Sequence, residues 1–236
     1  MGRMIALLAV IAAMLGGTVK AKADSAIVMV ELFTSQGCHS CPPADAYLGQ
    51  IADRDDVIAL SMHVDYWDYL GWRDVFGQAA HTKRQRAYAA TMKERMVYTP
   101  QIVVQGREAM VGSHSAKVED AIQRHAAADR AADISLIMRG DRLVAEIAPV
   151  GDDAVSGDVR MVWFSRAETV AIRSGENGGR DLTYHNVVKG WSDMGHWRGG
   201  RIAMTTAKPM EADGVAVFVQ AGQGGPILAA AKLTLP

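Results

Sequence analysis

The chain has 236 residues, with 25 basic and 26 acidic side chains and a formal net charge of −1. This near balance excludes a strongly basic surface of the kind that binds nucleic acid, so we expect no nucleic-acid partner. The length allows one large domain or two modest ones, each with its own core.

The N-terminal residues predict export. Arg3 precedes an almost wholly apolar stretch over residues 4–16, and Ala21-Lys22-Ala23 has the small-x-small pattern of a cleavage site. We therefore expect a signal peptide over residues 1–23, cleavage near Ala23, and a periplasmic or secreted protein. The apolar run is shorter than the roughly 20 residues of a membrane-spanning helix, so no stable membrane anchor is expected. Cleavage leaves 22 of the 25 basic side chains against 26 acidic ones.

The first half of the mature chain alternates between predicted strands and helices. Residues 26–33 are apolar except for Glu31, which is typical of a strand buried on both faces of a parallel sheet. A helix is expected from near Pro42 or Pro43, because the apolar residues that follow have helical spacing. Further elements are expected at 57–64 (strand), 78–96 (helix), 101–105 and 108–111 (antiparallel strands) and from Ser115 to about 127 (helix).

In the predicted helix 78–96, Tyr88, Met92 and Met96 are spaced four apart and are expected on its inner face. Its basic residues, 83, 84, 86, 93 and 95, are expected on a solvated face. From about residue 131 the pattern changes to short strands, at 134–139, 142–148, 159–165, 169–173, 184–188, 215–221 and 227–235. The expected fold class is thus an α/β domain over 24–130 followed by an all-β, sandwich-like domain over 131–236.

The two cysteines, Cys38 and Cys41, are separated by only two residues. A disulfide that closes so short a loop stabilises the folded state very little in the chain-entropy model. A C-x-x-C pair beside a strand-helix-strand pattern is instead typical of redox chemistry. The sequence therefore predicts a reactive pair rather than a structural bridge.

Three motifs carry a resemblance to a known family: ELFTSQGC over 31–38, SCPP over 40–43 and YTPQ over 98–101. With the order of elements, they resemble the thioredoxin fold over residues 24 to about 130. They are more closely similar to a bacterial exported thioredoxin-like family classed as a domain of unknown function. The resemblance implies that Cys38 is the attacking thiol, Cys41 the resolving thiol, and Pro100 a cis-proline that faces them.

The residues around the two cysteines support in part the assignment of Cys38 as the attacking thiol. A thiolate near a helix N-terminus has a lowered pKa, and Cys38, nearer the loop, is expected to be the more accessible of the two thiols. Pro42 and Pro43 lack the backbone N–H and delay the helix start, which puts that effect on Cys38 in doubt. His39 is either a nearby cation that compensates or an exposed polar turn residue.

Glu31 is the candidate proton acceptor, because thioredoxins keep a buried acid near the pair. The alternative is an outward-facing or salt-bridged acid. Residues 65–74 begin at the sheet edge that is expected to carry Cys38. Tyr66, Trp67 and Trp72 on this segment, with Thr99 beside Pro100, are candidate substrate-binding residues. Alternatively, the aromatic side chains pack as a small satellite core.

The favoured function is a thiol-disulfide oxidoreductase that acts on protein or small thiol and disulfide substrates, with an unidentified redox partner and no cofactor. One alternative is a protein that binds copper or zinc through Cys38, Cys41 and a histidine, either His39 or His63. Another is an interaction module that kept the fold and lost the reaction. The segment 112–115 lacks the G-x-S-x-G elbow of a serine nucleophile, and a helix cap at Ser115 explains it better.

Overall fold

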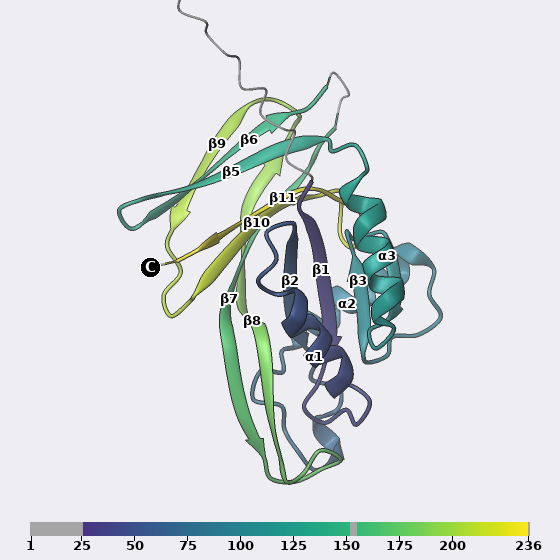
Figure 1. Ribbon diagram of the computed structural model, residues 1–236. Helices are drawn as coiled ribbons and strands as arrows, with labels where there is room; N and C mark the ends of the chain where they lie inside the picture. The colour runs from purple at the N-terminus through teal and green to yellow at the C-terminus, as the bar shows by residue number, and fades with distance from the viewer. Residues whose placement is uncertain (1–25, 152–154, 236) are drawn as a thin grey trace, which may run out of the picture.

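The computed structural model describes residues 26–151 and 155–235 of the chain, so the predicted signal peptide lies outside the described residues. The strands form an eight-stranded sheet, in the order β11-β10-β7-β8-β2-β1-β3-β4, and a three-stranded sheet, in the order β5-β6-β9 (Figure 1). The elements are β1 (Val28–Thr34), α1 (Pro42–Ile51), β2 (Val57–His63), a short 3-10 helix η1 (Asp68–Leu70), α2 (Ala79–Met92), β3 (Gln101–Val104), β4 (Glu108–Val111), α3 (Ser115–Ala126), β5 (Ala132–Arg139), β6 (Arg142–Pro149), β7 (Gly157–Ile172), β8 (Arg180–Trp197), β9 (Ile202–Ala207), β10 (Gly214–Gln220) and β11 (Ile227–Thr234).

The predicted division into an α/β thioredoxin-like domain and a separate all-β sandwich is wrong. One mixed sheet takes β1 to β4 from the first half of the chain and β7, β8, β10 and β11 from the second. The halves meet where β2 pairs with β8 in parallel, at Ser61 and Val187. An unpaired edge of a buried strand would leave its N–H and C=O groups without partners. Besides that one pair, Asn186 Nδ2 of β8 donates to the Ala59 carbonyl of β2 at 2.9 Å. The expected limits at 24–130 and 131–236 stay a prediction, because this topology does not test independent folding.

Individual elements differ from the prediction where local pattern is a weak guide. β7 is one continuous strand rather than two, and its register with β8 runs from Gly157 opposite Trp197 to Ile172 opposite Arg180. β9 is an additional strand. α2 ends at Met92, where Lys93 adopts a left-handed conformation with φ 58°, so Met96 is 69% exposed rather than on an inner face.

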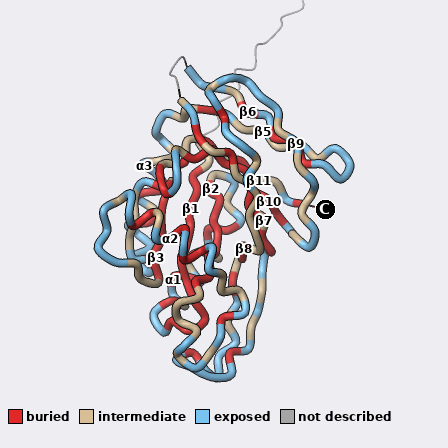
Figure 2. The backbone as a smooth tube through the Cα atoms, turned by 180° about the vertical axis from the view of Figure 1, so that it is seen from behind, coloured by how far each residue is buried: buried red, intermediate tan, exposed pale blue. Residues whose placement is uncertain are grey.

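The two faces of the central sheet bury different cores. Val28, Val30 and Leu32 of β1 pack with α1 and α3, whereas Met29 and Phe33 pack with Tyr88 of α2. Figure 1 shows α1 in front of β1 and β2, α3 beside it toward β3, and α2 behind the sheet, and Figure 2 shows β1 and β2 buried along their length. Because successive side chains alternate across a strand, Glu31 lies on the α2 face. Thr34 lies on the α1 face.

Candidate redox site around Cys38 and Cys41

The two cysteines form a disulfide where the chain passes from β1 into α1, with a Cα–Cα distance of 5.4 Å. α1 begins at Pro42, as the sequence predicts, and Cys41 is its N-cap residue. Proline is tolerated there because the first N–H groups of a helix have no intrahelical acceptor. The positive end of the helix dipole therefore acts more directly on Cys41 than on Cys38, which lies three residues earlier.

Contacts from another segment fix the loop that carries Cys38. The Gln36 N–H donates to Asp74 Oδ2 at 2.8 Å, and Trp72 Nε1 donates to Gln36 Oε1 at 2.8 Å. The Cys38 N–H donates to the Ser35 carbonyl at 3.1 Å. Cys38 is only 4% exposed and Cys41 is fully buried. The disulfide is thus held inside the molecule.

Asp45 is a functional candidate that the sequence analysis missed. It lies one helical turn after Cys41, and its carboxylate is buried without a hydrogen bond in the described chain. Burial raises the pKa of Asp45 to about 7, although the charge of His63 and the nearby Thr34 hydroxyl act to lower it. The spacing was a usable indication, because residues four apart on a helix share a face.

Asp45 belongs to a buried polar cluster on the α1 face. His63 Nδ1 lies 2.7 Å from Asp74 Oδ2, and the His63 ring contacts Tyr184 with centroids 4.7 Å apart. Burial acts to raise the pKa of Asp74, but His63 and the Gln36 and Phe76 N–H groups outweigh it, so the pKa is lowered. Several atoms here have no partner within the described residues: Thr34 Oγ1, Ser61 Oγ, His63 Nε2 and the Tyr184 hydroxyl. Such unpaired groups are uncommon in protein interiors.

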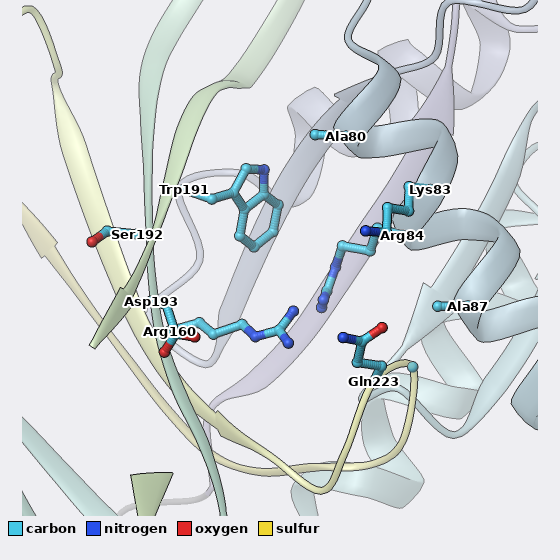
Figure 3. A pocket seen from close by; sticks show the side chains of 10 residues that line it. Ala80, Lys83, Arg84, Ala87, Arg160, Trp191, Ser192, Asp193 and Gln223 are labelled. Carbon is cyan, nitrogen blue, oxygen red and sulfur yellow. The ribbon is translucent and has the colours of Figure 1, made fainter. Parts of the chain in front are cut away.

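Glu31, the predicted proton acceptor, lies on the opposite face of the sheet. Its carboxylate binds Arg84, with Nε at 2.5 Å and Nη2 at 3.0 Å, and it accepts a 2.5 Å hydrogen bond from the Tyr88 hydroxyl. This is the salt-bridged alternative. Arg84 is correspondingly buried, contrary to the prediction of a solvated face. A cavity of about 270 Å³ adjoins Arg84 and is also lined by Lys83, Arg160 and Trp191 (Figure 3), none of which is a predicted site residue.

The Thr99–Pro100 peptide bond is cis, which confirms the expectation. Pro100 lies near the first turn of α1. A Cβ atom added to Gly112 would come 3.3 Å from the Pro100 Cβ and 3.1 Å from the Ala44 Cβ. Pro100 is therefore close to the helix that Cys41 caps.

The aromatic segment 65–74 lies at the same sheet edge, since the Val64 N–H donates to the Thr34 carbonyl at 2.9 Å. Trp67 Nε1 donates to Thr99 Oγ1 at 2.8 Å, and the Tyr66 hydroxyl donates to Gln85 Oε1 at 3.2 Å. Because both side chains bond other residues of the protein, these contacts favour packing of the segment over substrate binding. Tyr69, in contrast, is 76% exposed. Trp67 and Trp72 thus lie against the Cys38 loop and Thr99 bonds Trp67, whereas Tyr66 bonds Gln85 of α2.

His39 is exposed, and its N–H donates to Glu176 Oε2 at 3.1 Å. Within residues 26–151 and 155–235, no three His, Cys, Asp or Glu side chains are grouped to hold a metal ion. None of the helices described is both long and apolar enough to cross a membrane.

The fold and site define a class: a mostly β protein with an eight-stranded mixed sheet and a buried C-x-x-C disulfide at a helix start. Residues 29–220 match the family model described as "Protein of unknown function (DUF1223)", and the chain belongs to this family. No curated protein matches the chain.

Two solved structures are similar. A crystal structure of an Agrobacterium tumefaciens protein is 30% identical, with a TM-score of 0.79, over 90% of this chain and 96% of that one. HBP35 of Porphyromonas gingivalis is 14% identical, with a TM-score of 0.60, over 89% of this chain and 76% of that one. At that identity, HBP35 supports a shared fold alone.

Proposed function

We propose that the protein is a thiol-disulfide oxidoreductase that acts on protein or small thiol substrates together with a redox partner. The observation that carries the proposal is the disulfide at the N-terminus of α1, with an unpaired buried carboxyl one turn further along the same helix. A four-residue bridge contributes little stability, and a carboxyl group without hydrogen bonds contributes none. A redox function explains both features, because the disulfide can exchange electrons and the carboxyl group can exchange a proton.

In the reaction, the Cys38 thiolate attacks a substrate disulfide and forms a mixed disulfide, while one substrate thiolate leaves and takes a proton from water. The Cys41 thiol then gives its proton to Asp45 and attacks Cys38 Sγ. The second substrate thiolate leaves, and the Cys38–Cys41 disulfide forms again. Two electrons pass from the protein to the substrate. A carboxyl group with a pKa of about 7 is suited to accept and return the proton near neutral pH.

We also propose that this chemistry takes place outside the cytoplasm. The N-terminal pattern of Arg3, the apolar run and Ala21-Lys22-Ala23 supports export, and disulfides persist in oxidising compartments. N-terminal sequencing of exported protein is expected to give a chain that starts at or near Asp24. Recovery of intact Met1 in the membrane fraction would contradict this.

The test compares Cys41→Ser with Cys38→Ser in the reduced protein. With a disulfide substrate, Cys41→Ser is expected to accumulate mixed disulfides on a non-reducing gel, because Cys38 attacks but nothing resolves the intermediate. Cys38→Ser is expected to trap little. A metal-binding protein would give a different result: either variant would lose copper or zinc by mass spectrometry, and neither would form adducts. A metal-free protein whose Cys38 has an ordinary thiol pKa of about 8.5 and forms no adduct would leave the interaction module as the explanation.

A further inference from the structure

The turn between β7 and β8, residues 173–179 and called the hairpin tip below, covers the redox site from the second half of the chain. Asn177 Nδ2 donates to the carbonyl oxygens of Gln36 and Cys38, both at 2.9 Å. Glu176 Oε2 accepts the His39 N–H at 3.1 Å. Figure 1 shows the long β7–β8 hairpin running past β2 to this end of the molecule. The hairpin tip therefore occupies main-chain groups on both sides of Cys38.

The hairpin tip is shaped to this position. Asn177 is only 1% exposed, and Arg180 Nη1 donates to its Oδ1 at 3.0 Å, which leaves the amide nitrogen to face the two carbonyl oxygens. Ser174 Oγ donates to the Gly71 carbonyl at 2.7 Å. Gly175 has φ 74°, and a Cβ atom there would come 3.0 Å from the Trp72 Cβ. The hairpin tip thus contacts both the Cys38 loop and the aromatic segment.

This cover restricts the chemistry. Exchange begins when a thiolate approaches a sulfur of the disulfide, and only Cys38 has any exposed surface. A thiol must therefore displace the hairpin tip, which takes away the partners of the Gln36 carbonyl and the His39 N–H. It also leaves the Cys38 carbonyl with the Cys41 N–H alone, at 3.2 Å. A thiol on a single amino acid has too short a main chain to replace all of these bonds at once. An extended polypeptide can, because its main chain offers alternating N–H donors and C=O acceptors.

We propose that the hairpin tip is the selectivity element of the redox site: Asn177 and Glu176 hold it over Cys38, and a polypeptide thiol that pairs with residues 36–39 displaces it more readily than a small thiol does. This inference rests on the proposed function and names its substrate class. Asn177 acts as a positioning residue, because it holds the main chain around Cys38 rather than the reacting sulfur.

The test follows the reduction of the Cys38–Cys41 disulfide by two thiols. A thiolate attacks Cys38 Sγ, the Cys38–Cys41 bond breaks, and Cys41 leaves and takes a proton. A second thiolate attacks the substrate sulfur of the mixed disulfide, and Cys38 leaves and takes a proton. Two thiols become one disulfide, and the protein gains the two electrons and two protons.

The experiment measures how fast the oxidised protein is reduced by two probes whose thiols are chemically alike. One probe is N-acetylcysteinamide, and the other is a short unstructured peptide with one central cysteine. Alkylation followed by mass spectrometry gives both rates. In the wild type we expect the peptide to react at least about tenfold faster, the factor that corresponds to one to two hydrogen bonds. In Asn177→Ala the small-thiol rate is expected to rise about tenfold, with a smaller rise for the peptide, so that the ratio of rates falls.

Two further variants distinguish release of the hairpin tip from Cys38 from a general destabilisation of the β7–β8 hairpin. Ser174→Ala removes the bond to Gly71 without touching the Cys38 loop, and we expect it to raise the small-thiol rate a few-fold. Thr169→Ala is the matched control, because Thr169 Oγ1 bonds Thr183 Oγ1 at 2.9 Å across the same hairpin, away from the site. Its rates should equal those of the wild type.

Equal peptide and small-thiol rates in the wild type would overturn the inference and leave the proposed function in place. An Asn177→Ala variant with an unchanged small-thiol rate would do the same. A disulfide that neither probe reduces in any variant would overturn both.

Discussion

Glu31 on β1 and Asp45 on α1 are both buried carboxyl groups, one on each face of the same sheet. Glu31 is bound by Arg84 and Tyr88, whereas Asp45 has no hydrogen bond within the described residues and a pKa raised to about 7 by burial. A buried charge is tolerated when its partners replace water, whereas burial without such partners raises the pKa of an acid. The paired acid is therefore a structural group, and the unpaired acid can exchange a proton.

The largest effect is expected on the paired face. Arg84→Met leaves the Glu31 charge buried without its cation, and breaking such a pair costs about 3–5 kcal/mol. Urea unfolding measures the loss. The surface variant Arg166→Met, which breaks an exposed bridge to Asp53, is expected to cost less than about 1 kcal/mol. If the two losses were equal, the buried Glu31–Arg84 pair would contribute no more to stability than an exposed ion pair.

Asp45→Asn is expected to stabilise the protein at alkaline pH. Below about pH 4 the carboxyl is protonated in both the folded and the unfolded state. Between about 4 and 7 the unfolded state loses this proton while the folded state keeps it, so the contribution of Asp45 to the free energy of unfolding falls as pH rises. A pKa raised from 3.8 to about 7 corresponds to a loss of up to about 4 kcal/mol.

The variant should lack this decline and should match the wild type near pH 4. Urea unfolding at a series of pH values measures it, with the exposed Asp181→Asn as the control. A difference in stability between variant and wild type that stays constant over this pH range would show that the pKa of Asp45 is not raised in the folded protein.

The same variant should slow the chemistry. Without the carboxyl group one helical turn away, the Cys41 thiol must give its proton directly to water, and a positioned acid or base is typically worth about a hundredfold or more. Resolution of a pre-formed mixed disulfide on Cys38, followed by stopped flow, isolates this step. Attack by Cys38 should change less. Equal slowing of both steps would indicate a general change in the loop rather than proton transfer by Asp45.

The sequence predicts well the elements that carry Cys38 and Cys41. Continuous apolar runs specify β1 and β2, and Pro42 specifies the start of α1, because these are local properties of the chain. Asp45 could have been found from its four-residue spacing to Cys41. The β2–β8 pairing could not be predicted, and neither could the bond from Asn177 to the Cys38 carbonyl. That bond joins residues 139 positions apart, and a contact over such a distance leaves no periodic pattern in the sequence. For the same reason, Arg84 could not be predicted as the partner of Glu31, 53 positions away.

The smallest expected effect concerns the aromatic segment 65–74, at the sheet edge that carries Cys38. It distinguishes substrate binding by this segment from packing. Tyr69 is exposed and stacks on Trp67 with centroids 6.3 Å apart. If the segment binds substrate, Tyr69→Ser should slow exchange with an aromatic-rich peptide thiol a few-fold. It should change the free energy of unfolding by less than about 0.5 kcal/mol, as is usual for exposed positions. Trp67→Phe is the matched variant, because it removes the bond to Thr99 and should cost about 1 kcal/mol of stability. Unchanged peptide kinetics in Tyr69→Ser, with the stability loss confined to Trp67→Phe, would assign the segment to packing alone.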